Sequence, residues 1–578
     1  MSFRERSAAE IGAAQPEAIL APILRKLVED SAAALAAMPP DAREAATQAR
    51  AAAVANLEGL HAQLREALER RGVRYHRAAT AAEAVGIVQH LLRRARRVAK
   101  SKSMVAEEIG LTRALRQRGI DVLETDIGEY VVDLEGRGPS HITAPALHLN
   151  RAHIRELLAR AGHDVPDDGP QRLSRIVRDT VARFFEDCDA AITGANAVIA
   201  SSGRIVIVEN EGNVALGVSH PKLHIVVTGL EKVVADEAAA LAVLQVLAPS
   251  ATAQPLTAFT HVVGDPLPGQ ERHVVFVDNG RSTIAAEARY RDLLRCIRCG
   301  ACMNACPVYR VAGGLSYGSV YMGPVGAVLS PLLWRDGRYA DLPFASSLCG
   351  RCTEVCPVGI PLHRMLLELR ADAAESGRTP TAERFAWRAW AAAFGGGRGR
   401  MAVAAGRWLW RAMRPLRRPR ARDPRVLPPL DPIHSPARLA PGGPAGEPPP
   451  APPLLRPPEP LIDAFCARAA ALGAEVTETY APQPGDRLVE AAAAVAATGS
   501  LLLTGEAADR RAILGAARVV VLVDAARIVP YPADLAPHLG TGDALILTGA
   551  SRTADIEKQI VRGIHGSDRL TIVLRGTG

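Results

Sequence analysis

The chain has 578 residues, of which 48% are hydrophobic and only 4% aromatic, and its net charge is +8. This length is too great for one hydrophobic core and predicts about three or four structural units. Much of the positive charge lies in residues 384–425, without a helix-turn-helix, zinc-finger or RNA-binding signature, which argues against a nucleic-acid partner. The chain has no run of 18 apolar residues and its first residues lack the apolar core of a signal peptide. We therefore expect a cytoplasmic protein without a transmembrane segment.

The first part of the chain predicts a helical region followed by an α/β domain. Residues 1–70 have helical spacing, for example Leu57, Leu60, Leu64 and Leu68. From residue 71 to about 280, short apolar strands alternate with helices. This alternation predicts a parallel sheet covered by helices, so the fold class is multidomain α/β.

Polar residues lie in or beside the apolar strands of this α/β region, and parallel sheets gather ligands at their strand ends. Lys102 is a candidate to neutralise a carboxylate, and His141 or His224 to accept a hydroxyl proton. For each residue the alternative is a structural hydrogen bond. The candidates are Lys100, Lys102, Glu107, Glu108, Glu129, His141, His148, Glu209, Glu211, Asn213, His224 and Lys232.

Seven of the nine cysteines form two short motifs within residues 281–375. The spacing C-x2-C-x2-C-x3-C-P is that of bacterial ferredoxins with two [4Fe–4S] clusters, in which the fourth cysteine of a run binds the neighbouring cluster. The segment is therefore predicted to be an α-helical dicluster ferredoxin-like module. One predicted cluster has the ligands Cys296, Cys299, Cys302 and Cys356, and the other has Cys306, Cys349 and Cys352.

The second predicted cluster lacks one thiolate, because Ser346 stands where a complete motif has its first cysteine. A serine ligand, an open corner and a three-iron cluster all remain possible on sequence grounds. Structural zinc is the competing interpretation, but it favours pairs of cysteines over three in a row followed by Cys-Pro. Cys188 and Cys466 lie in apolar helical patterns and are expected to be buried structural thiols.

Three segments follow the cysteine module. Residues 376–423 are rich in Trp and Arg and predict a packed or partner-docking helical segment, with docking on an anionic membrane face as the less favoured alternative. Residues 424–460 contain 15 of the 42 prolines and predict a linker. Residues 461–578 regain a βα pattern. Here Val495–Leu503 repeats Ile199–Ile207, with a glycine at the same place in both copies. Residues 548–557 predict a turn that leads from a strand into a helix.

Several runs together resemble a known family: SKSMVAEEIGL (101–111), ETDIGEYVVDLEG (124–136), ITGANAVIASSGRIVIVENEGN (192–213) and the paired cysteine motifs. They resemble lactate utilisation protein B, the iron–sulfur subunit of the bacterial L-lactate utilisation system. The tail, with TGASRTADIEKQIVRGIHG (548–566), resembles part of its companion, lactate utilisation protein C. The chain thus resembles a fusion of the two proteins.

The resemblance implies a LUD domain at 71–280, with the fold of coenzyme A transferases and sugar-phosphate isomerases, and a partial LUD domain at 461–578. It also implies electron transport in a lactate-oxidising complex, an L-lactate dehydrogenase, together with a cysteine-rich partner subunit. A small 2-hydroxy acid is the expected substrate of that complex. A redox-sensing iron–sulfur protein and an electron-transfer subunit for another 2-hydroxy acid are the alternative functions. No flavin or nicotinamide motif is visible, and no catalytic residue is assigned.

Overall fold

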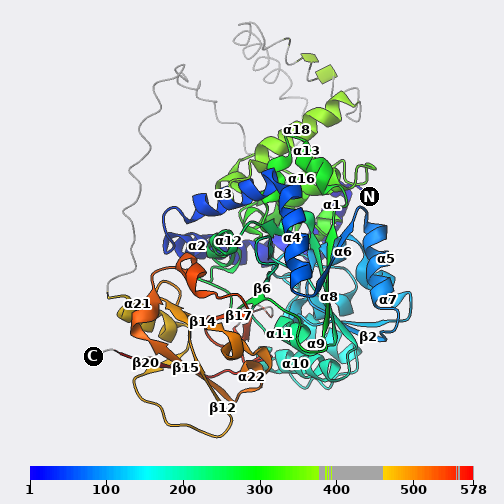
Figure 1. Cartoon of the computed structure of the whole chain (residues 1–578). Helices are drawn as coiled ribbons and strands as arrows, with labels where there is room; N and C mark the ends of the chain where they lie inside the picture. The colour runs from blue at the N-terminus through cyan, green and yellow to red at the C-terminus, as the bar shows by residue number, and fades with distance from the viewer. Residues whose placement is uncertain are drawn as a thin grey trace. The chain divides into compact units, whose positions relative to one another are not determined.

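The computed structural model describes residues 1–376, 460–554, 556 and 560–576, and five isolated positions between 385 and 392 (Figure 1). Residues 1–368 and 454–578 form one compact unit and residues 369–453 another. The predicted Trp/Arg-rich segment and Pro-rich linker lie almost entirely outside the described residues. Within the described part of the chain, no helix is both long and apolar enough to cross a bilayer.

Four helices open the chain, as the apolar spacing predicts. The leucines at 57, 60, 64 and 68 all lie on the buried face of the fourth helix. The helices are α1 (Phe3–Ala14), α2 (Pro16–Ala36), α3 (Ala42–Ala55) and α4 (Leu57–Arg70).

A six-stranded, wholly parallel sheet forms the centre of the first α/β region. Two of its inner strands, Glu271–Val277 and Leu223–Gly229, are buried except at their first residues, as expected for a parallel sheet with helices on both faces. In spatial order the strands are β1 (Val73–Ala78), β10 (Glu271–Val277), β7 (Leu223–Gly229), β4 (Ala190–Thr193), β2 (Arg97–Lys100) and β3 (Asp121–Glu124).

The connections between these strands supply the helices on the two faces and one long helix, α12, which packs against α2 and α3. The helices are α5 (Ala81–Leu91), α6 (Met104–Glu108), α7 (Leu111–Arg116), α8 (Ile127–Glu135), α9 (Arg151–Arg160), α10 (Pro170–Glu186), α11 (Asn213–Ser219), η1 (Leu230–Lys232), α12 (Glu237–Thr252) and α13 (Arg281–Ala286).

A second sheet of eight strands combines the first α/β region with the tail. Four of its strands come from each region, and the two halves join through antiparallel pairing of β17 with β9, where Phe259 faces Leu547. One continuous sheet therefore joins the tail to the first α/β region. In spatial order the strands are β16 (Ile528–Val529), β13 (Ala493–Val495), β14 (Ser500–Thr504), β17 (Ala544–Leu547), β9 (Phe259–Val263), β6 (Ile205–Glu209), β5 (Ala197–Ile199) and β8 (Val233–Val234).

The internal repeat is visible as two equivalent strand–turn–strand units, β5–β6 and β13–β14. The turn glycines Gly203 and Gly499 have φ values of 70° and 65°. A Cβ at Gly203 would lie 2.8 Å from the carbonyl carbon of Ala67, and one at Gly499 would lie 2.7 Å from the amide nitrogen of Ala469. Both positions therefore need glycine for conformation and for space.

The tail carries a third sheet, also parallel: β11 (Glu475–Thr477), β20 (Leu570–Arg575), β15 (Arg518–Asp524) and β12 (Asp486–Glu490). Its helices are α21 (Leu461–Ala471), α22 (Arg510–Gly515), η7 (Gly505–Ala508), η8 (Ala525–Arg527) and η9 (Pro532–His538). The helix predicted within 548–557 is wrong for the described residues. A short strand β18 (Arg552–Thr553) pairs there with β19 (Val561–Arg562), because backbone groups of Asn210 and Glu211 bind the segment.

Short helices and loops form the cysteine-rich module between the two α/β regions of the sequence. In the sequence, helix α16 separates the two cysteine motifs, and this helix is almost entirely buried. The helices are η2 (Arg291–Arg295), α14 (Ala301–Asn304), α15 (Pro307–Ala312), η3 (Leu315–Tyr317), α16 (Gly323–Leu333), η4 (Leu342–Phe344), α17 (Arg351–Glu354) and α18 (Leu362–Glu375).

Candidate functional site: the cysteine motifs and the adjoining sheet edge

The two cysteine motifs share one backbone conformation. Arg298 and Leu348 have φ values of 62° and 56°, and two residues later Gly300 and Gly350 have φ values of 79° and 81°. A four-residue helix follows in each motif. Left-handed residues at alternate positions bend a chain sharply, and non-glycine residues adopt this conformation only where the surroundings impose it. The second motif therefore repeats the fold of the first.

Ser346 occupies the place of the missing cysteine in this repeated fold. The amide of Arg298 donates to the sulfur of Cys296 at 3.4 Å, and the amide of Leu348 donates to Oγ of Ser346 at 3.1 Å. Each of these two side-chain atoms thus accepts a hydrogen bond from the amide two residues later in its own loop.

The first group of neighbouring thiols contains Cys296, Cys299, Cys302 and Cys356. Burial raises the pKa of Cys299, and the negative charges of Cys356 and Cys296 raise it further. Burial likewise raises the pKa of Cys302, with Cys296 and Cys299 as its nearest charged neighbours. The last cysteine of the second motif is therefore adjacent to the first three of the first motif.

The second group contains Cys306, Cys349 and Cys352. Burial, Cys306 and Cys349 together raise the pKa of Cys352 to about 11. All nine cysteines of the chain are free thiols. Among the described residues, no three His, Cys, Asp or Glu side chains converge closely enough to hold one metal ion. An iron–sulfur cluster does not need such convergence, because each thiolate binds its own iron. Free thiols in two groups fit that donor chemistry, and among the seven only Cys349 is exposed.

Two arginines of α3 tie the cysteine module to the N-terminal helices. Arg43 donates from Nη2 to the carbonyl oxygens of Glu354 and Cys356, both at 2.8 Å. Arg50 is fully buried and donates to the carbonyls of Leu294 and Arg295, which lie directly before Cys296. The helical N-terminal region therefore holds both cysteine loops in place.

Charged side chains of the α/β region surround the first motif. Arg298 Nη2 donates to Glu231 Oε1 at 3.1 Å, and Arg281 Nε donates to Glu231 Oε2 at 2.6 Å. Lys232 lies beside Arg298 and Cys296. Burial and the charge of Arg298 lower the pKa of Lys232 to about 8.

A cavity of about 860 Å³ extends from the first cysteine motif along one edge of the parallel sheet. Four neighbouring strands of this sheet end at its wall, so the cavity lies at the carboxyl ends of parallel strands, where α/β folds bind ligands. The lining residues at these ends are Asp126, 101–103, 194–196, Val227 and Thr228. Ile297 and Arg298, between the first two cysteines, close the side next to the motif.

Comparison with known proteins identifies the family. The LUD domain family matches residues 61–285 and 487–574, and the 4Fe–4S dicluster domain matches residues 292–360. Proteins named lactate utilization protein B from Bacillus cytotoxicus and Bacillus cereus are each 44% identical over 353 residues, which is 60% of this chain and 74% of theirs. The chain belongs to the LUD domain family. A crystal structure of a duf162 family protein from Deinococcus radiodurans covers 38% of this chain and 98% of its own, at 18% identity and a TM-score of 0.21.

The family match has two segments, and the second lies in the tail whose strands extend the sheet of the first. The LUD domain residues of the tail are thus part of the architecture around the cavity: Arg552, Thr553 and Ala554 line it. The tail has no counterpart of β2 and β3 among its described strands, which is consistent with a partial LUD domain.

Half of the predicted polar residues of the LUD domain meet in the cavity wall, namely Lys102, His141, Glu209, Glu211, Asn213 and Lys232. The others do not line it. Lys100 is fully buried and pairs with Glu107 and Glu124 at 2.8 Å. Glu108 accepts hydrogen bonds from Arg281 and from the hydroxyl of Tyr321. These residues hold the LUD domain together.

The two histidines proposed as proton acceptors are structural in this arrangement. His224 is fully buried within the sheet. Its Nε2 lies 2.9 Å from Thr193 Oγ1, and its Nδ1 accepts from Arg272 at 3.1 Å. His141 Nδ1 accepts the amide proton of Thr143, so its Nε2 carries the proton and donates to Asn304 Oδ1 at 2.8 Å. His141 therefore connects the LUD domain to the first cysteine motif.

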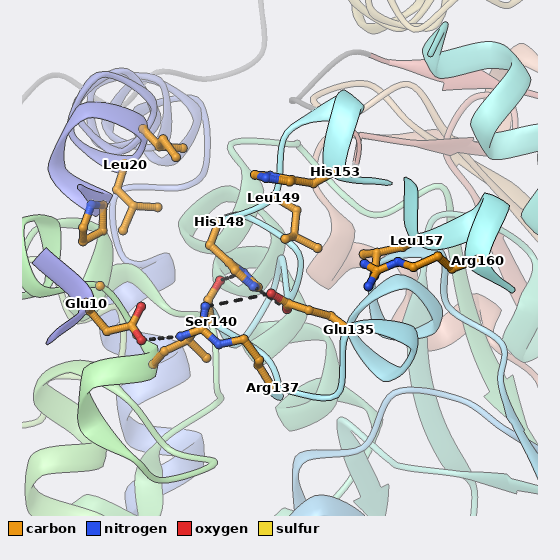
Figure 2. A pocket seen from close by; sticks show the side chains of 15 residues that line it. Glu10, Leu20, Glu135, Arg137, Ser140, His148, Leu149, His153, Leu157 and Arg160 are labelled. Atoms are coloured by element: carbon orange, nitrogen blue, oxygen red, sulfur yellow. Dashed lines mark hydrogen bonds and ion pairs between the residues drawn. The ribbon is translucent and has the colours of Figure 1, made fainter. Parts of the chain in front are cut away.

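His148 lines a separate, smaller cavity of about 220 Å³. Figure 2 shows its polar side chains directed at one another. His148 lies 2.8 Å from Glu135 Oε2 and 2.7 Å from Ser140 Oγ, and Arg137 pairs with Glu10. Both carboxylates that line this cavity, Glu10 and Glu135, therefore have partners within it.

The sequence analysis missed Arg298 and the α3 arginines as parts of the site. Arg298 was visible as the residue between two predicted ligands, so its place beside a cluster was open to inference. Arg43 and Arg50 carry no such signal, because they lie in a helix about 250 residues before the motif and only folding brings them to it.

Proposed function

We propose that this chain is the iron–sulfur electron-transfer subunit of a complex that oxidises L-lactate to pyruvate. The observation that carries the proposal is the joining of two groups of free thiols, most of them buried or half-buried, to a LUD domain whose cavity reaches the first cysteine motif. The similarity to lactate utilization protein B supplies the substrate.

In this proposal two sets of cysteines hold two clusters. Cys296, Cys299, Cys302 and Cys356 bind the first, and Cys306, Cys349 and Cys352 bind the second. Iron–sulfur clusters supply one-electron transfer when bound. Oxidation of lactate to pyruvate releases two electrons and two protons, which two one-electron carriers in one module match. The electrons leave to a cysteine-rich partner subunit, and the complex works in the cytoplasm.

The experiment that tests the proposal is a reduction titration of the full-length protein, purified anaerobically together with its partner subunits. L-Lactate is expected to reduce both clusters, seen as bleaching of the visible absorption and as two electron paramagnetic resonance signals. Preparations with zinc in place of iron and acid-labile sulfide would refute the cofactor. Reduction by another 2-hydroxy acid but not by lactate would refute the substrate.

Ser346 is the fourth ligand of the second cluster in this proposal. Its hydroxyl oxygen occupies the loop position that corresponds to the Cys296 sulfur. Ser346→Cys is expected to keep a four-iron cluster and to shift only the second resonance signal. Ser346→Ala is expected to remove one iron, which appears as the signal of an oxidised three-iron cluster. The neighbouring Ser347→Ala is the matched control, and identical spectra for wild type and Ser346→Ala would exclude serine ligation.

A further inference from the structure

The large cavity has a mixed lining that suits an organic molecule. Apolar side chains come from α2 and α12, among them Leu24, Leu27 and Leu247, and others come from the sheet. Polar groups are concentrated at the strand ends and beside Arg298. Cavities of several hundred cubic ångströms with an apolar lining and a few convergent polar groups are typical of small-molecule sites.

The acidic side chains of this wall are already satisfied. Glu209 accepts four hydrogen bonds, from the amides of Gly212, Val214 and Ala215 and from His261 Nε2, at 2.7 to 2.9 Å. Glu211 accepts the amide proton of Ile127 at 3.2 Å. Neither carboxylate is therefore available to balance a cation in the cavity.

Basic groups of the same wall are only partly satisfied. The Lys102 ammonium is buried, makes no hydrogen bond, and has Glu129 as its charged neighbour at 3.7 Å. Burial raises the pKa of Glu129 to about 8, which weakens it as a partner for the Lys102 ammonium, although Lys102 itself acts in the opposite direction. Lys232 is only 7% exposed and has neither hydrogen bond nor ion pair among the described residues. Arg298 Nη1 is buried without an acceptor.

Buried ammonium and guanidinium groups without an acceptor are costly, and an anionic ligand would remove that cost. We propose that this cavity binds a small organic acid of the 2-hydroxycarboxylate class, with the ligand carboxylate paired to Lys102. Lys232 and Arg298 add positive charge on the side of the first cysteine motif. The choice of a 2-hydroxy acid, rather than another carboxylate, rests on the proposed function.

The cavity is large enough for 2-hydroxy acids with longer side chains than lactate. About 860 Å³ is far more than a three-carbon acid fills, and the lining beyond the charged groups includes the apolar side chains of α2 and α12. Acids with longer side chains, such as 2-hydroxyhexanoate, are therefore expected to bind at least as tightly as L-lactate.

The test is calorimetric titration of the oxidised, cluster-loaded, full-length protein with L-lactate, 2-hydroxyhexanoate and inorganic phosphate, without an electron acceptor. Lys102→Gln is expected to weaken binding of both acids about tenfold or more, the effect of one lost charge-assisted hydrogen bond. Lys102→Arg should retain most of the affinity. Lys222→Gln, at an exposed lysine outside the cavity, is the matched control and should bind like wild type.

Iron content and circular dichroism show whether each variant is folded and loaded. Equal affinity in wild type and Lys102→Gln, no binding of either acid, or tighter binding of phosphate than of the acids would overturn the inference. Lys102-dependent binding without reduction of the clusters would refute the proposed function and leave this site standing. If lactate reduced the clusters equally in wild type and Lys102→Gln, the proposed function would stand and the Lys102 site would be refuted.

Discussion

Cys299→Ala is expected to lower lactate-driven reduction by about two orders of magnitude or more. Losing a residue that merely supports a metal ligand costs 10–100-fold, so loss of a ligand should cost at least as much. Alanine is preferable to serine here, because a hydroxyl oxygen is itself a candidate ligand. Cys299 is buried among Cys296, Cys302 and Cys356, so no water-exposed group replaces its sulfur easily. The measurement is anaerobic stopped-flow bleaching, with iron and sulfide analysis of the same sample.

The matched control is Cys188→Ala. Cys188 is half-buried in the LUD domain, its thiol lies 3.8 Å from the carbonyl of Phe185, and it belongs to neither thiol group. It should retain both resonance signals and the wild-type rate. Full lactate-driven reduction in Cys299→Ala, with one signal gone, would mean that the first cluster is not on the electron path.

Arg281→Met is expected to destabilise the folded protein by about 3–5 kcal/mol, the cost of removing one partner from a buried ion pair. Arg281 is fully buried between two carboxylates, donating to Glu108 and to Glu231, in each case at 2.6 Å. The pKa of Glu231 is about 2 although its burial alone would raise it, because Arg281 and Arg298 hold it charged. Without Arg281, part of this negative charge stays buried without compensation. Anaerobic denaturant unfolding followed by circular dichroism measures the loss.

An exposed pair provides the comparison. Arg335 pairs with Glu287 at 2.5 Å, but both side chains are substantially exposed. Arg335→Met is therefore expected to cost at most about 1 kcal/mol. If Arg281→Met and Arg335→Met proved equally stable, the buried network would contribute little to the stability of the LUD domain and cysteine module.

Local spacing explains what could be predicted. The helices of residues 1–70 and the alternation of strands and helices in residues 71–280 were predicted, because strand and helix periods act over a few neighbouring side chains. The repeat of Gly203 and Gly499 was predictable for the same reason. The helix expected within 548–557 failed because backbone contacts from residues 210 and 211, more than 300 positions away, bind that segment as a strand.

The sequence by itself determined the cysteine spacing and the alternation of strands and helices, since both are local patterns. The spacing predicted iron–sulfur chemistry, and the resemblance of several runs together with the cysteine motifs predicted the family. Only the tertiary structure decided which polar residues meet. Lys102, Lys232 and Arg298 reach one cavity from three distant stretches, whereas His224, equally prominent in the sequence, is enclosed by the sheet. It also decided that the tail shares a sheet with the first region. The physical reason is that burial and charge pairing depend on packing between distant segments, which leaves no periodic trace along the chain.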